Sequence, residues 1–370
     1  MAHTSGRYLR ELSVDRATGH FACEVWEWPE QTLVEVLWGG MDEGKVVARG
    51  IGLPPRVRVL QVQRWPVSQQ GLLAQALPDA HPRNVRFIYR YDPQPRQWVE
   101  LLRRPLATLQ SGPPPLDIRV LLPLAWAPDG QRFLCEEGRV AKLYDLAGRE
   151  LGSVTTDVWP DFPTFWPHPR RIFFGRYAGT TELQVPERGP ARAVPLPAGN
   201  VLMVDARTRR ETPITQTGRV LSYAVNADGS EVVALEGGTE LGHVAVTAYR
   251  LDGRLGSESL GLARPGPDLS LTVSGPRIVL STRDRAAQEE TYPTLSIVDR
   301  EARSVTALAD AAGRPLRGWA PRFLSTAKLL FIAPISPNPA EALAWKGESL
   351  YVYDFATRCV AAVQVYPGND

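Results

Sequence analysis

The sequence predicts an all-β fold of short antiparallel strands, and three observations carry this prediction. A strand–turn–strand element recurs along the chain, and glycine (31) and proline (33) are frequent enough to supply many turns. No long segment shows the 3.6-residue apolar period of an amphipathic helix, so helix should be very scarce. Because 370 residues exceed the usual domain length two- to threefold, we expect several domains or one large repeat architecture.

The clearer of two repeated elements is a short apolar strand, an aspartate, a polar turn and a second strand. An aspartate suits this position because its carboxylate can accept a hydrogen bond from the backbone two residues on and so start a tight turn. We therefore expect these aspartates to be structural. They recur at intervals of 47 to 60 residues: Asp92, Asp145, Asp205, Asp252, Asp299 and Asp354.

A second element precedes each of these by roughly thirty residues and consists of a strand, a tight turn and a strand. Its clearest copies are LAWAPDGQRFLC, from Leu124, and YAVNADGSEVVAL, from Tyr223. TFWPHPRRIFF is a looser copy, in which His168 and Pro169 replace the Asp-Gly turn and Trp166 is expected in the core.

Together the two elements make a unit of four strands, a to d, with tight a–b and c–d turns and a looser b–c connection. Such a unit, repeated about every 40 to 50 residues, is typical of a propeller blade. We predict one domain over residues 1–370, a seven-bladed β-propeller of four-stranded antiparallel blades. The expected blades are roughly 5–52, 53–104, 117–156, 157–217, 218–264, 265–312 and 313–370.

Three segments, AWAPDGQRFL, AVNADGSEVV and TFWPHPRRIF, resemble the PD40 repeat of TolB-like propellers, which also occurs in the propellers of prolyl-oligopeptidase-type peptidases. The resemblance implies the fold and not an activity. Those peptidases append a hydrolase domain, whereas no G-x-S-x-G nucleophile elbow is present here. The GH and WD signatures of WD40 blades are also absent, although the expected architecture is WD40-like.

Composition and charge exclude several classes of function. We expect a soluble, cytoplasmic protein because no signal peptide or apolar membrane span is visible. The net charge of +2 disfavours nucleic-acid binding, and any such binding should be weak and sensitive to salt. Cys23, Cys135 and Cys359 form no CxxC pair and should be buried thiols. We expect no cofactor and no histidine-based metal site, while calcium ligation by carboxylates stays open.

The b–c and d–a connections are long and should share one face of the ring, here named the long-loop face. Long loops on a rigid scaffold usually carry function, so we place a binding surface there. An indole flanked by carboxylates, as at residue 159, can stack on a ligand, and an exposed indole at 345 suits a protein partner. The candidate binding residues are Asp157, Trp159, Asp161, Arg176, Tyr177, His243, Arg283, Tyr292 and Trp345.

No catalytic constellation stands out, so the favoured function is a non-catalytic scaffold that presents the long-loop face to a protein or peptide partner. The alternative is a hydrolase or lyase that acts on a glycan, lactone or peptide at the mouth of the central funnel, with Glu136, Glu137, Asp161 or Asp284 as acid or base. A small-molecule sensor at the same mouth is a third interpretation. The partner and the oligomeric state do not follow from the sequence.

The two ends of the chain predict how the ring closes. The last unit holds four strands of its own, with CVAAVQVY as its outer strand, and the first unit opens with an inner strand near Tyr8–Val14. The ring should therefore close without a blade shared between the two termini.

Overall fold

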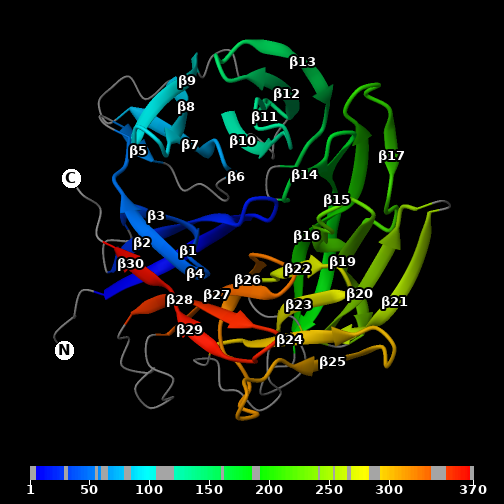
Figure 1. The fold of residues 1–370 in the computed structure, drawn as a ribbon. Helices are drawn as coiled ribbons and strands as arrows, with labels where there is room; N and C mark the ends of the chain where they lie inside the picture. Colours follow the sequence, from blue (N-terminus) through cyan, green and yellow to red (C-terminus); the bar gives the residue numbers. More distant parts are fainter. Residues whose placement is uncertain are drawn as a thin grey trace.

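The computed structural model describes residues 6–28, 32–54, 57–59, 66–78, 85–105, 121–159, 162–185, 192–240, 242–252, 255–264, 268–282, 292–334 and 347–366. No helix occurs in these ranges. Strands that follow one another in the chain and share a sheet pair antiparallel. The sheets are arranged around a common centre (Figure 1). The predicted all-β propeller fold is confirmed.

The strands of the described residues fall into seven successive groups, which we interpret as seven blades. The first three groups are β1 (Gly6–Asp15), β2 (His20–Trp28), β3 (Thr32–Asp42) and β4 (Lys45–Ile51); β5 (Val57–Val59), β6 (Val67–Ser68), β7 (Gly71–Pro78), β8 (Val85–Asp92) and β9 (Gln97–Pro105); and β10 (Leu121–Trp126), β11 (Arg132–Glu137), β12 (Val140–Asp145) and β13 (Glu150–Thr155). Both β5 and β6 pair with β7, so the inner strand of the second blade is in two pieces.

The fourth and fifth blades form one eight-stranded sheet, because Gly199 of β16 pairs with Val220 of β18. The strands of these two blades are β14 (Phe165–His168), β15 (Arg171–Val185), β16 (Arg192–Asp205) and β17 (Glu211–Pro213); and β18 (Val220–Val225), β19 (Glu231–Glu240), β20 (His243–Arg250) and β21 (Gly256–Ala263). The remaining strands are β22 (Leu271–Ser274), β23 (Arg277–Thr282), β24 (Thr294–Asp299) and β25 (Ser304–Ala307); β26 (Trp319–Phe323), β27 (Lys328–Pro334), β28 (Glu348–Asp354) and β29 (Val360–Ala362); and β30 (Gln364–Tyr366).

Five of the six repeated aspartates accept backbone hydrogen bonds at the start of their c–d turns, as predicted, and the turn after Asp252 lies outside the described residues. Asp145 accepts a hydrogen bond from the Ala147 amide at 2.9 Å, and Asp354 accepts one from Ala356 at 2.9 Å. At Asp205, backbone hydrogen bonds to the carboxylate lower its pKa to about 2. These carboxylates are ionised caps that hold the turns.

The a–b turns of successive blades are joined by hydrogen bonds. The Gly275 amide donates to Oδ1 of Asn226 at 3.0 Å, which links the sixth blade to the fifth. Nη1 of Arg277 donates to the Thr326 carbonyl at 2.6 Å, which links the sixth blade to the seventh. These turns therefore share one face, here named the turn face, and the long-loop face lies opposite.

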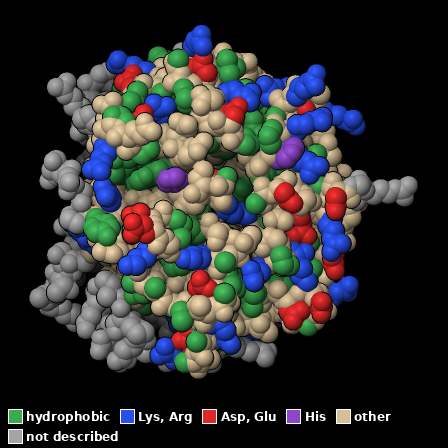
Figure 2. Space-filling model, in the orientation of Figure 1, with side chains coloured by type: hydrophobic (Ala, Val, Ile, Leu, Met, Phe, Trp, Pro, Cys, Tyr) green, Lys and Arg blue, Asp and Glu red, His purple; other side chains and the backbone are tan. Residues whose placement is uncertain are grey.

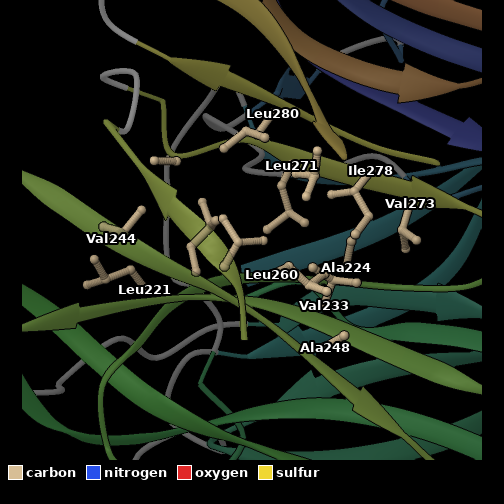
Figure 3. Packing of buried hydrophobic residues seen from close by; sticks show 14 of the residues in the cluster. Leu221, Ala224, Val233, Val244, Ala248, Leu260, Leu271, Val273, Ile278 and Leu280 are labelled. Atoms are coloured by element: carbon tan, nitrogen blue, oxygen red, sulfur yellow. The ribbon is translucent and has the colours of Figure 1, made fainter. Parts of the chain in front are cut away.

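The core lies between neighbouring blades. In one cluster, Leu221 and Val233 of the fifth blade pack against Leu271 and Ile278 of the sixth (Figure 3). Trp166 is buried between the third and fourth blades, as expected from its place on strand a. Each sheet thus buries apolar side chains against the next sheet around the ring.

The thiols behave as expected at two of the three positions. Cys23 and Cys135 are fully buried in strands, and burial raises the pKa of each thiol. Cys359 is exposed, which corrects the expectation of a buried residue. Its position precedes β29, an outer strand whose residues are all exposed.

The last blade has four strands of its own, as predicted, with β29 as the outer one. The expectation that no sheet is shared between the two termini is wrong, because β30 joins the first sheet beside β4. The segment expected as one outer strand is divided, however. Val363 is buried in the core between the first and last blades, and after it β30 pairs in parallel with β4, with Val365 opposite Ala48. The Arg49 guanidinium lies 5.9 Å from the centre of the Tyr366 ring.

We predict that Asp299→Ala lowers the free energy of unfolding by about 1 to 2 kcal/mol, because the Asp299 carboxylate accepts two backbone hydrogen bonds, from Glu301 at 3.0 Å and Ala302 at 2.9 Å. Chemical denaturation measures the change. Asp299→Asn is the matched control, since its amide oxygen can accept the same bonds. Equal loss in both variants would show that charge, and not turn capping, matters here.

Candidate functional site

Two long hairpins dominate the part of the long-loop face that the structure describes. The ladder of β15 and β16 runs from the pair Arg171–Asp205 to the pair Val185–Arg192, whereas the matching strands β11 and β12 of the third blade have six residues each. Beside it, the β19–β20 ladder extends to the pair Glu240–His243. Within the described residues, these two b–c connections, expected to be long loops, are therefore largely paired strand.

The β15–β16 hairpin, here named the arm, has one buried and one exposed side. Leu183 and Ala198 are buried in the same core cluster as Leu221 and Val244, so the inner side is held against the fifth blade. The outer side exposes residues of alternate positions on both strands: Ala178, Thr180, Glu182, Pro195 and Pro197. A hairpin that packs in this way is a rigid extension of the ring.

An ionic cluster lies at the base of the arm. Nη2 of Arg176 lies 3.0 Å from Oε1 and 3.1 Å from Oε2 of Glu211, and it also donates to the Thr156 carbonyl at 3.2 Å. Nearby in sequence, Oδ1 of Asp157 pairs with Nη2 of Arg139 at 3.2 Å. The Arg176–Glu211 pair lies within the fourth blade, and the hydrogen bond from Arg176 to Thr156 ties that blade to the end of the third.

Trp159 occupies a different environment from the one expected. Its side chain is 5% exposed and packs edge-on against Phe162 (ring centroids 4.2 Å apart) and Tyr177 (5.2 Å). A Cβ added at Gly175 would lie 2.2 Å from Phe162, so that glycine makes room for the cluster. The buried indole is not a stacking surface for a ligand; it supports Tyr177, which is 38% exposed.

The other candidate residues do not join this cluster. His243 lies on β20 within 3.4 Å of Nε of Arg264, and the Tyr292 hydroxyl donates to Oε1 of Glu348 at 3.1 Å. The structure therefore brings together four of the candidates, at 157, 159, 176 and 177. Three more fall outside the described residues: Asp161, Arg283 and Trp345.

Two of the candidate acid–base residues of the enzyme alternative, Glu136 and Glu137, lie in the described part of the chain. Both are held by contacts within the protein. Burial alone would raise the pKa of Glu137, but hydrogen bonds from Tyr144 and Lys142 and the charge of Arg104 hold it below its ordinary value. Glu136 is fully buried and accepts a hydrogen bond from the Arg139 amide at 3.1 Å. Glu137 is thus an ionised, triply bonded group, and Asp284 lies outside the described residues.

Sequence reasoning missed Glu348, a buried carboxyl where the first, sixth and seventh blades meet. Oε2 accepts a hydrogen bond from the Leu9 amide at 2.9 Å, and Oε1 accepts the one from Tyr292. Burial raises the pKa of Glu348 to about 7, although these bonds and the charge of Arg10 act in the opposite direction. The sequence feature that could have indicated this residue is an acidic side chain at the first position of an apolar strand.

Neither metal nor membrane features emerge from the described residues. They contain no group of three His, Cys, Asp or Glu side chains that could hold a metal ion. Nor do they contain a helix long and apolar enough to cross a bilayer.

No protein-family model matches the chain, and no curated protein matches it. Among solved structures it is similar to the β-propeller domain of the trilobed protease from Pyrococcus furiosus, with a TM-score of 0.57 and 13% identity over 99% of both chains. It is also similar to the Pyrococcus horikoshii acylaminoacyl peptidase (0.55, 12% identity), covering 98% of this chain and 53% of that one. For the tricorn protease the values are 0.54 and 10%, covering 98% and 35%.

At these identities the likeness shows the fold alone. The chain spans about half of the acylaminoacyl peptidase and about a third of the tricorn protease. It is a β-propeller of the kind that those peptidases contain.

We predict that Trp159→Ala destabilises the protein by about 3 to 5 kcal/mol, because it empties a buried aromatic site next to Phe162. Thermal melts measure the loss. Trp159→Phe, which keeps most of the apolar volume, should recover a large part of it. A melting temperature unchanged in the alanine variant would mean that the indole is exposed in solution.

We predict that Glu348→Gln becomes more stable than the wild type as pH rises. The folded-state pKa of about 7 lies above the value of about 4.3 for an unfolded chain. The contribution of this carboxyl to the free energy of unfolding is therefore fully present below about pH 4.3 and is lost as the pH rises through 7. Between pH 5 and 8 the stability difference should shift toward the variant by about 3 kcal/mol, which denaturation curves can follow.

The control for this experiment is Glu182→Gln, which removes an exposed carboxyl on the arm. Its stability difference from the wild type should stay nearly constant over the same pH range. If the two variants behave alike, Glu348 is not a buried titrating group.

Proposed function

We propose that the protein is a non-catalytic propeller scaffold that presents its long-loop face to a protein or peptide partner, with the outer side of the arm as the contact surface. The observation that carries the proposal is the asymmetry of the arm. Its inner side is buried with Leu183 and Ala198, while its outer side is exposed over both strands. A rigid, preformed surface loses little conformational entropy when it binds, which favours recognition.

The outer side has the chemical character of a contact surface. Tyr177 supplies an aromatic ring that the buried Trp159 holds in place, and tyrosine is enriched where binding energy concentrates. Pro195 and Pro197 stand on the exposed side of β16 and have no amide hydrogen to donate. We infer that side chains, and not an added β-strand, mediate the contact, since prolines on an edge disfavour strand addition.

The enzyme alternative stays a prediction without support from a specific contact. Glu137 is fixed as an ionised group by three donors, which does not suit a general acid. The similar proteases carry names that describe proteolysis, but the likeness to them extends to the fold only.

The test combines an affinity capture with a matched control. The wild type and Tyr177→Ala are used as baits in parallel, and proteins retained by the wild type are identified and purified. Tyr177→Ala should weaken binding of the purified partner by about 2 kcal/mol, the scale of an aromatic hot spot, without a comparable loss of stability. Leu151→Ala, which removes another exposed apolar side chain on the outer strand of the third blade, should bind as the wild type does.

Cross-linking of the complex locates the contact. Cross-links that map to the arm agree with the proposal. A partner that binds Tyr177→Ala and the wild type equally, or that cross-links to the turn face, would place the interface elsewhere.

A further inference from the structure

The described strands cover the outer edge of the first blade incompletely. Strand β4 has seven residues, whereas β30 has three, which pair with Val47, Ala48 and Arg49 (Figure 1). Among the described strands this is the one parallel pair, and none of them pairs with the outer edge of β4 before Val47 or after Arg49. The two ends of β4 therefore keep outward backbone groups with which a longer strand could pair.

Strand β30 is attached less firmly than the residue before it. Val363 is buried, and its amide donates to the Leu350 carbonyl at 2.9 Å. The residues of β30 are all exposed, and parallel pairing is slightly weaker per residue than antiparallel pairing. The next residue in the sequence is a proline, which has no amide hydrogen to add to the ladder. Release of β30 therefore needs no rearrangement of the core at Val363.

The first blade has other attachments to the ring besides β30. Glu348 of the seventh blade accepts a hydrogen bond from β1, and Nζ of Lys328 donates to the Gly44 carbonyl at 3.0 Å. Nη2 of Arg16, in the a–b turn of the first blade, donates to the Val225 carbonyl of the fifth blade at 3.0 Å. These contacts hold the first blade in place when β30 leaves its edge, so β30 can act as a removable cover.

The exposed side of β4 indicates the chemistry of a strand that would replace β30. Lys45 and Arg49 are exposed on this side, two turns of the strand period apart. Tyr366 lies opposite Arg49, whose guanidinium is 5.9 Å from the centre of the ring. If the register continues, a residue four positions before the aromatic one lies opposite Lys45. In the chain itself that position is Ala362, which belongs to β29. Opposite charges on paired residues stabilise a sheet, so an acidic residue suits the position better.

We propose that the outer edge of β4 is a strand-addition site for an extended segment of a partner protein, with an acidic residue followed four positions later by an aromatic one, and that β30 covers this site within the same chain. Main-chain hydrogen bonds give such a contact its affinity, and alternate side chains give it specificity. On the face shown in Figure 2, by contrast, the apolar side chains drawn in colour lie in small groups among charged ones.

This site lies on the first blade, whereas the arm belongs to the fourth. The proposed function and the strand-addition site can therefore fail separately.

The probe is a fluorescent peptide, E-V-Q-V-Y-V-T, which keeps the Gln-Val-Tyr of β30 and places a glutamate opposite Lys45. It is titrated into the full-length wild type and into Val365→Pro/Tyr366→Pro, and anisotropy reports binding. Adjacent amides of a strand point to opposite edges, so one of the two prolines removes a donor to β4. Because β30 competes at a high effective concentration, the peptide should bind this variant at least about tenfold more tightly than the wild type.

Matched controls separate strand pairing from other effects. Val365→Ile/Tyr366→Phe keeps both amides and the ring, so it should bind the peptide as the wild type does. A peptide methylated on the amide nitrogens of its central valine and tyrosine should not bind, because one of these amides must face β4. Adding Lys45→Glu to the proline variant should weaken binding, and a peptide with lysine in place of glutamate should restore it.

Hydrogen exchange on the wild type covers the case in which the proline variant does not fold. With the peptide in excess, the amides at the ends of β4 should exchange more slowly and those of Gln364–Tyr366 faster. The proposal is overturned if the peptide binds the wild type and the proline variant equally, binds neither, or protects another segment. It is also overturned if the proline variant forms a dimer that the peptide does not dissociate, since the edge then takes a second copy of the chain.

Discussion

The fold depends on the packing of each blade's apolar face against the next blade. A single four-stranded sheet here has no other place to bury side chains such as Leu271 and Ile278, which meet Leu221 and Val233 of the neighbouring sheet. Packing of this kind continues around the ring, so the first and last blades must also meet. Their joint cluster includes Leu9, Leu350 and Val363. Closure is thus set by side-chain burial, with Glu348 as one polar contact at the same junction.

Because the packing between neighbouring blades determines only the core, the two faces of the ring can differ in structure. On the turn face, short turns capped by aspartates bring neighbouring blades into hydrogen-bonding distance, as at Asn226 and Gly275. On the opposite face nothing in the blade packing limits strand length, and β15 and β16 continue as a paired ladder beyond the sheet core. The ring therefore supplies rigidity, and differences in b–c length supply the features by which one propeller differs from another.

The repeat predicted the fold because its signals are local. An aspartate before a polar turn determines its own hydrogen bonds, and Asp145, Asp205 and Asp299 behave as expected. The site was less predictable, because its character depends on contacts between distant segments. Nothing near Trp159 in sequence reveals that Gly175 leaves space to bury it with Phe162. Likewise, Glu348 and Arg16 acquire their surroundings from residues more than two hundred positions away.

The parallel pairing of β30 with β4 has a consequence for the order of events during synthesis. The outer edge of the first blade is complete only when residues 364–366 lie beside Val47, Ala48 and Arg49. On a growing chain, the first sheet to emerge therefore keeps an open hydrogen-bonding edge until nearly all the others have been made. An open edge of this kind can pair with other strands. Of the seven blades, the first is thus the longest exposed, and the segment that covers its edge follows the seventh blade in the chain.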